Sequence, residues 1–183
     1  EADEVIALIS ALSHPSDEHP AAAERVAAVL DIYQEQPGVL DPSLEAMVLP
    51  LLSSVRLISR GELARANLAP ACRVMYALCK VRGYKTILKF VPHEVHELEP
   101  LVALLNTVPP SEHDAWQIAY SLMVWLSMVV MVPFDLSIID STLANAPIAD
   151  AAHEKGDEAT GTLVRTIEAL ARGYLGTTGP ARD

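Results

Sequence analysis

The sequence is poor in aromatic residues and in cysteine. Aromatic residues make up 5% of the 183 positions, whereas hydrophobic residues make up 51%. Because leucine, alanine and valine supply most of this apolar content, the composition favours helices packed on helices over a β-sheet. The two cysteines are Cys72 and Cys79, and on one helix they would lie about 10 Å apart. A disulfide reaches about 7 Å between Cα atoms, so we predict two reduced thiols on a buried helix face.

The sequence also lacks the local motifs of common active sites. It contains no GxSxG, P-loop or GxGxxG motif and no zinc-type spacing of cysteines. The segment His93-Glu94-Val95-His96-Glu97 resembles a metal motif. Its histidines are three positions apart, however, whereas the HExxH zinc signature has them four apart. An acidic first helical turn with exposed histidines explains the segment better. We therefore predict a non-catalytic protein without a metal site or cofactor.

No apolar run has the length that a bilayer span requires. The most apolar stretch, residues 118–132, has 15 residues, whereas a transmembrane helix needs about 20. We predict a buried core helix here and no membrane span, with Trp116 and Trp125 packed in the core. The sequence pI near 4.9 argues against a general nucleic-acid-binding protein.

Apolar residues recur with helical spacing along most of the chain. Asp41 and Pro42 predict the start of the clearest helix, and Pro50 should kink this helix rather than end it. Weaker stripes predict helices at residues 5–12, 26–33, 62–81, 95–105, 118–132 and 162–174. For the helix at residues 62–81, a first turn that begins at Pro70 is the alternative. The closest candidate for a strand, residues 86–91, is too short and isolated to pair. The clearest stripe consists of Leu44, Met47, Val48, Leu51, Leu52, Val55 and Ile58.

The spacing of the predicted helices indicates a repeat. Alternate helices begin about 40 to 50 residues apart, and HEAT and armadillo arrays repeat a helical hairpin every 40–47 residues or so. We therefore predict an all-α, HEAT/armadillo-like helical-repeat solenoid of about three helical hairpins plus a terminal helix. Residues 1–183 would form one such segment, and residues 137–161, which are small and polar, a long loop. A compact bundle is the alternative. The solenoid is favoured because both helices of each hairpin carry a stripe to bury, as an inner member of a stack must.

One block of the chain lacks acidic residues although the formal net charge is −11. Residues 63–93 contain no aspartate or glutamate but six of the thirteen basic residues. We predict that this block attracts an acidic protein partner over long range, by an interaction that salt weakens. A solvated basic helix face is the alternative. The predicted partner-binding residues are Arg73, Lys80, Arg82, Tyr84, Lys85 and Lys89.

A series of uncommon residues that begins in the basic block resembles the sequence of a known family. The series comprises Cys79-Lys80-Val81-Arg82-Gly83-Tyr84-Lys85-Thr86, Phe90, Pro92-His93-Glu94-Val95 and Leu98-Glu99-Pro100. It continues with Trp116, Tyr120, Trp125-Leu126-Ser127 and Pro133-Phe134-Asp135-Leu136-Ser137. In this order the residues resemble the tubulin-folding cofactor D family over roughly residues 75–140. Ala119 departs from the resemblance, because the family carries an arginine in this helix; an ion pair made there in relatives is missing here.

The resemblance implies a fold and a set of partners. The family is a long HEAT/armadillo-type solenoid, of which this chain would be an N-terminal portion. It captures β-tubulin and, with cofactors C and E, assembles or takes apart the α/β-tubulin heterodimer in the cytoplasm, in association with the microtubule cytoskeleton. It also binds an Arf-like small GTPase, and the joint complex stimulates GTP hydrolysis. A GTPase-activating role would need an arginine, for which Arg82 is the candidate here, although cofactor C is favoured as its source. The alternative role is a purely structural cap of the solenoid, with the tubulin and GTPase contacts elsewhere in the full chain.

Overall fold

The computed structural model describes residues 2–12, 14, 18–111, 115–131 and 162–176, and every regular element in these residues is a helix. The α-helices are α1 (Ala2–Ala11), α2 (His19–Asp31), α3 (Leu44–Ser59), α4 (Leu68–Arg82), α5 (Tyr84–Ile87), α6 (Leu98–Asn106), α7 (Trp116–Val129) and α10 (Thr162–Leu175). The 3-10 helices between them are η1 (Ile32–Glu35), η2 (Pro37–Ser43), η3 (Arg65–Asn67), η4 (Leu88–Phe90) and η5 (Val95–Glu97). The loop predicted at residues 137–161 lies outside the described residues.

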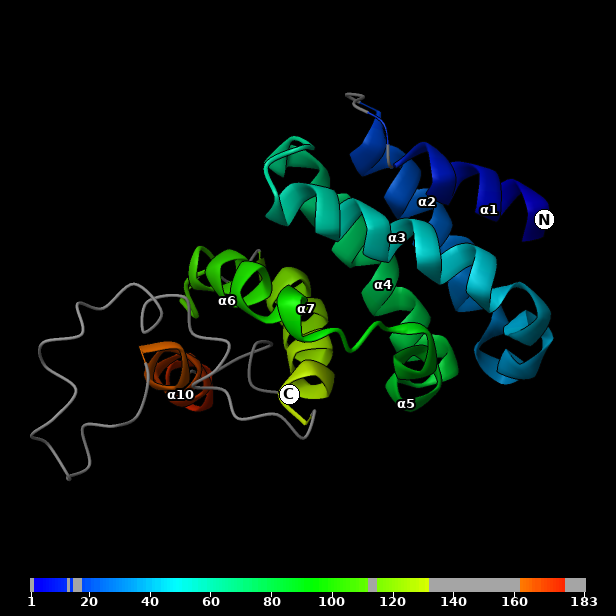
Figure 1. Ribbon diagram of the computed structural model, residues 1–183. Helices are drawn as coiled ribbons and strands as arrows, with labels where there is room; N and C mark the ends of the chain where they lie inside the picture. Colours follow the sequence, from blue (N-terminus) through cyan, green and yellow to red (C-terminus); the bar gives the residue numbers. More distant parts are fainter. Residues whose placement is uncertain (1, 13, 15–17, 112–114, 132–161, 177–183) are drawn as a thin grey trace, which may run out of the picture.

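The long helices form three stacked hairpins. Helices α1 and α2, α3 and α4, and α6 and α7 pack as pairs. Across the pairs, α2, α4 and α7 are neighbours in one layer and α1, α3 and α6 in the other, while α10 packs on α6. Figure 1 shows the hairpins following one another from the N-terminal helices to α6 and α7, with α10 beyond them. The prediction of an all-α solenoid of about three helical hairpins plus a terminal helix is confirmed.

Helix α3 buries the apolar stripe that the sequence predicts. All seven residues of that stripe are buried, with Leu51 and Val48 completely inaccessible. Pro50 lies inside the helix without ending it, as predicted. The Ser54 hydroxyl donates a hydrogen bond of 2.9 Å to the Pro50 carbonyl, so this buried polar side chain is paired within its own helix.

Helix α4 begins later than its predicted start at residue 62. Gly61 has a positive φ of 74°, and the amide of Glu62 donates to the Leu57 carbonyl at 2.8 Å. These contacts close the end of α3, and η3 then precedes α4. Pro70 falls in the first turn of α4, where its missing N–H costs no helical hydrogen bond.

Gly83 ends α4 with a backbone conformation that other residues avoid. Its φ is 90° and its ψ is 130°, and its amide donates to the Cys79 carbonyl at 2.9 Å. A side chain at this position would strain the backbone, since L-residues rarely adopt such a φ. The chain then continues as α5 and η4, so the rejection of a strand at residues 86–91 is confirmed.

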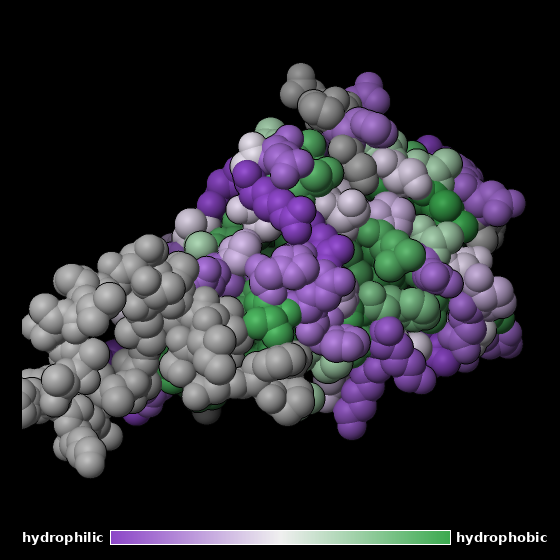
Figure 2. All heavy atoms as spheres, viewed as in Figure 1, coloured by the Kyte–Doolittle hydropathy of each residue, from purple (hydrophilic) through white to green (hydrophobic). Residues whose placement is uncertain are grey.

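Helix α3 is strongly apolar because it lies in the core of the stack. By length and composition alone, the combined segment Pro37–Ser59 is apolar enough to cross a membrane. In the fold the buried apolar residues of α3 pack against α1, α4 and α6. Large apolar side chains are exposed at Ile32, Val39, Leu49, Tyr84, Met131 and Leu175. Figure 2 shows hydrophilic side chains in a band across one face, with hydrophobic areas on both sides of it.

Both cysteines lie buried in α4 as free thiols, as the sequence predicts. Burial raises the pKa of Cys72 and of Cys79 from 9.0 to about 12. Hydrogen bonds with Ser121 and Tyr120 respectively oppose these shifts without cancelling them. Since the thiolate is the reactive form, the folded chain keeps both groups unreactive.

We expect neither thiol to react at pH 8 in the folded chain. A pKa of about 12 in place of 9.0 makes the thiolate fraction at this pH smaller by about a thousandfold. A chromogenic disulfide reagent should therefore detect both cysteines after unfolding in urea and neither within minutes beforehand. Rapid modification of either cysteine in the native chain would contradict this packing of α4.

Candidate partner-binding surface

The predicted partner-binding residues follow one another along α4 and the turn after it. Arg73 and Lys80 are seven positions apart, which places them on one side of the helix. Arg82 is the last residue of α4, Tyr84 and Lys85 lie in α5, and Lys89 lies in η4. The structure thus brings the six residues onto adjoining elements.

Three of these cations are paired with carboxylates of α2 or η2. Arg73 contacts Glu24 at 3.3 Å, and Lys80 contacts Asp31 at 3.1 Å. Both carboxylates belong to α2, and their separation of seven residues matches that of the two cations. The pairs therefore run between two neighbouring helices at the same register.

Arg82 forms the third pair, with Asp41 of η2. Its guanidinium donates two hydrogen bonds to that carboxylate, and the one from Nη2 to Oδ2 is 2.8 Å long. The hydrogen bond from Arg82 lowers the pKa of Asp41, and Lys89 adds a weaker Coulombic effect. In the same way, hydrogen bonds from Lys80 and then from Gln34 lower the pKa of Asp31. Both carboxylates are therefore ionised at neutral pH.

The end of the basic block remains open. Among the described residues, Lys85 and Lys89 form no ion pair within 4 Å, and both side chains are exposed. Tyr84 is 46% exposed beside them. Counting Arg73, Lys80, Arg82, Lys85 and Lys89 against Glu24, Asp31 and Asp41 gives five positive and three negative charges, a net charge of +2. The surface is thus mixed in charge along α4 and basic beyond its end.

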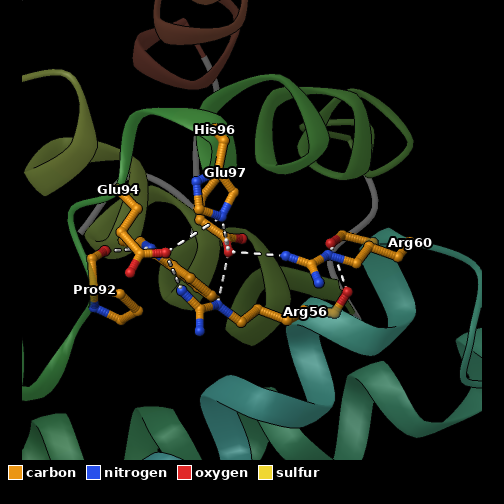
Figure 3. Close-up of polar contacts among 8 residues, drawn as sticks. Arg56, Arg60, Pro92, Glu94, His96 and Glu97 are labelled. Carbon is orange, nitrogen blue, oxygen red and sulfur yellow. Dashed lines mark hydrogen bonds and ion pairs between the residues drawn. The ribbon is translucent and has the colours of Figure 1, made fainter.

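A second charged cluster lies where η5 meets the end of α3 (Figure 3). Glu97 is only 3% exposed, and its Oε1 lies 3.3 Å from Arg60 Nη2 and 3.3 Å from His96 Nε2. Arg56 Nε lies 2.8 Å from the same oxygen, without the alignment of a hydrogen bond. Arg56 also donates to Glu94 at 3.1 Å. These contacts join the second hairpin to the third.

The segment 93–97 suggested a metal site in the sequence, and the cluster in the structure differs from it. His93 is exposed and stands apart from it, whereas Glu94, His96 and Glu97 bring their ligand atoms within 4.8 Å of one another. Arg56 and Arg60 already face these carboxylates and balance their charge. Because two cations occupy the place that a metal ion would need, the arrangement fits an ion-pair network better than a metal site.

The two tryptophans occupy different environments. Trp125 is 3% exposed, and its indole Nε1 donates to the Pro92 carbonyl at 3.0 Å, so its predicted core position is confirmed. Trp116 is half-buried, with its ring centroid 4.5 Å from that of Tyr76. Ala119, where the resemblance would place an arginine, is 2% exposed in α7. An apolar contact therefore takes the place of any ion pair there.

Sequence reasoning missed the carboxylates that pair with the basic block. Glu24 and Asp31 share the seven-residue spacing of Arg73 and Lys80, which was the available signal. The first carboxylates that follow the block in the sequence include Glu94 and Glu97, but Arg56 and Arg60 pair with these two instead. The role of the six predicted residues in binding a partner stays a prediction.

Comparison with known proteins identifies the kind of protein to which this fold belongs. The fold is that of an armadillo-type helical-repeat protein, and residues 30–183 match the family described as "Tubulin-specific chaperone D-like, ARM repeat". The chain belongs to this family, so the resemblance seen in the sequence is confirmed and extends well beyond residues 75–140. No solved structure matches the chain.

Two relatives show how much of a longer protein the chain represents. It is 32% identical to tubulin-folding cofactor D of Schizosaccharomyces pombe over 114 residues, which cover 62% of this chain and 10% of that protein. It is 24% identical to tubulin-specific chaperone D of Dictyostelium discoideum over 203 aligned positions, which cover 68% of this chain and 14% of that protein. The chain thus spans about a tenth to a seventh of the length of these relatives.

We expect Glu97→Gln to destabilise the fold by about 1–3 kcal/mol. The substitution removes a buried charge that faces Arg56 and Arg60 and leaves both cations without it. Urea unfolding followed by circular dichroism measures the loss. Glu94→Gln is the matched control, because Glu94 is 56% exposed and should cost less than about 0.5 kcal/mol. Equal effects of the two substitutions would show that burial of Glu97 is unimportant.

Proposed function

We propose that this chain is a non-catalytic, tubulin-binding segment of a tubulin-folding cofactor. Its family membership supports a role in tubulin folding. In the full protein we expect this segment to help capture β-tubulin, and to contribute to assembly or disassembly of the heterodimer with cofactors C and E and an Arf-like small GTPase. The setting we propose for this activity is the cytoplasm and the microtubule cytoskeleton.

The observation that carries the proposal is the basic end of the α4 surface. Lys85 and Lys89 are exposed cations with no ion pair among the described residues, on a chain of formal net charge −11. Tyr84 lies beside them with 46% of its surface exposed. Tyrosine is enriched at protein interfaces, and lysines beside it would attract an acidic partner by long-range electrostatics. An acidic partner would gain two unpaired charges here and could also compete for the paired ones.

A GTPase-activating role for Arg82 is less well supported. An arginine that reaches a nucleotide must be free to extend to the transferred phosphate. Arg82 instead holds Asp41 through two hydrogen bonds, and 27% of its side chain is exposed. Both buried thiols also have a raised pKa, which disfavours them as nucleophiles. We therefore place any arginine needed for GTP hydrolysis in a partner protein.

A structural role is the second candidate, and a specific observation favours it. Three of the five cations pair with carboxylates of the first hairpin or of η2. These side chains would then fasten the first and second hairpins to each other and position later repeats. Exposed ion pairs contribute little to stability, so this role concerns orientation more than free energy.

The proposal predicts that reversing the open cations weakens tubulin binding. Lys85→Glu with Lys89→Glu should reduce affinity for the tubulin heterodimer by at least about tenfold at low salt, and by less at moderate salt. These two positions are chosen because changing Lys80 or Arg82 would also break pairs within the fold. Binding is measured by sedimentation or on a sensor surface.

The control is Arg25→Glu with Arg172→Glu, which makes the same change in charge at exposed sites on α2 and α10. It breaks two exposed ion pairs, with Glu4 and Glu168, which contribute little to stability. The helical circular dichroism signal of each variant must equal that of the parent. Binding that is unchanged by the substitutions at Lys85 and Lys89 would remove this surface from the mechanism. If the parent chain itself fails to bind tubulin, the structural role replaces the proposed one.

A further inference from the structure

An aromatic row runs along the junction of α4 and α7. The Tyr76 ring stands edge-on to two rings of α7, with its centroid 4.5 Å from that of Trp116 and 5.2 Å from that of Tyr120. The interplanar angles are 80° and 88°. Trp116 and Tyr120 are four positions apart and therefore lie on one side of α7. All three side chains are half-buried, so each leaves part of its surface in contact with solvent.

Tyr84 extends the row beyond the end of α4. The pKa of Tyr120 is raised to about 12, chiefly by burial, and the nearby Cys79, Tyr76 and Tyr84 add to the increase. Tyr84 lies in α5, which directly follows α4 and packs against it, and it is the most exposed tyrosine of the group, at 46%. We call Trp116, Tyr76, Tyr120 and Tyr84 the aromatic row.

The elements that carry the aromatic row have basic side chains and no acidic ones. Helix α4 contains Arg73, Lys80 and Arg82, and α5 contains Lys85, but neither contains an aspartate or glutamate. Helix α7 has no charged residue at all. The carboxylates that the structure pairs with α4 come from α2, which packs against α4 beside α7 in the same layer, and from Asp41 of η2. The surface around the rings is thus mixed in charge along α4 and basic at Lys85, so an acidic ligand would meet one cation without an ion pair among the described residues and could compete for the paired ones.

We infer that the aromatic row is a docking site for an acidic peptide segment that carries an apolar side chain. The apolar side chain would lie on the exposed parts of the rings, because tyrosine and tryptophan offer large contact area at little conformational cost. The carboxylates of the segment would pair with Arg73, Lys80 and Lys85, in competition with Glu24 and Asp31. The inference rests on the proposed function, since it names the chemistry that the basic surface would recognise in its partner.

The contrasting interpretation is that the rings only hold α4 to α7. Edge-on aromatic pairs stabilise such contacts by about 0.5–1.5 kcal/mol, which would account for Tyr76, Trp116 and Tyr120. It would not account for Tyr84, whose ring is nearly half exposed. The two interpretations predict different peptide binding. If the rings only pack α4 against α7, acidic peptides with and without an apolar residue should bind with equal affinity.

The test compares three short synthetic peptides. The first is polyglutamate with one central phenylalanine, the second is the same peptide with serine in place of phenylalanine, and the third is polylysine with the central phenylalanine. We expect the first to bind at least about tenfold more tightly than either of the others. The measurements use fluorescence anisotropy of labelled peptides with the full chain at low salt.

Tryptophan fluorescence locates the site of binding. In a Trp125→Phe chain, Trp116 is the remaining tryptophan and reports on the aromatic row. Its emission should shift, and its quenching by acrylamide should fall, when the phenylalanine-containing acidic peptide binds. If Trp125→Phe fails to fold, anisotropy with the unaltered chain and the variants below decides the question.

Tyr84→Glu and Leu49→Glu form a matched pair. Both introduce one negative charge at an apolar position of similar exposure, 46% and 47%, but Leu49 lies on α3 in the other layer. Tyr84→Glu should weaken binding of the acidic phenylalanine peptide by at least about tenfold, and Leu49→Glu by less than about twofold. Equal effects of the two substitutions would overturn the assignment of the docking site to the aromatic row.

Binding of tubulin to the same chain separates failure of this inference from failure of the proposed function. If tubulin binds and the two acidic peptides bind equally, the aromatic row is not a docking site, while the proposed role of the basic surface is retained. If tubulin binds and neither acidic peptide does, the inferred ligand is wrong. If neither tubulin nor any peptide binds, the proposed function fails together with the inference.

Discussion

Helix α4 packs against α2, α3 and α7 at once, and this burial constrains every feature of its sequence. Ten of its fifteen residues are buried, including both cysteines and Pro70. Apart from Arg82 at its last position, its charged and aromatic residues lie in the narrow sector that remains, which holds Arg73, Tyr76 and Lys80. Charged and aromatic side chains therefore concentrate there because no other part of the helix can hold them. The burial that fixes the hairpins relative to one another also creates the basic surface.

The two charged clusters act on different junctions of the stack. The pairs of Arg73 with Glu24 and of Lys80 with Asp31 cross from the second hairpin to the first. The network around Glu97 crosses from the second hairpin to the third. Only the latter has a buried carboxylate, so it alone should contribute substantially to the free energy of folding. The outer pairs remain available for exchange with a partner's carboxylates.

The helices of this fold could be predicted from local sequence, whereas its contacts could not. The stripe from Leu44 to Ile58 gave α3 because one residue in three or four is enough to define a buried face. The sequence left the start of α4 open between residue 62 and Pro70, and in the structure the helix begins at Leu68, after the turn at Gly61 and η3. The partners of the basic residues lie 41 to 49 positions away. Their pairing depends on the register of stacked hairpins, which no local pattern contains.

Hydrogen exchange of the chain with and without the tubulin heterodimer tests this account most directly. In the free chain, amides of α4 should exchange among the slowest, because this helix is buried on three sides. When tubulin is added, new protection should appear at residues 83–90 and in the first turn of α7, while α1 and α10 stay unchanged. Fast exchange throughout α4, or protection confined to α1 or α10, would contradict the view that one helix both centres the stack and presents its binding surface.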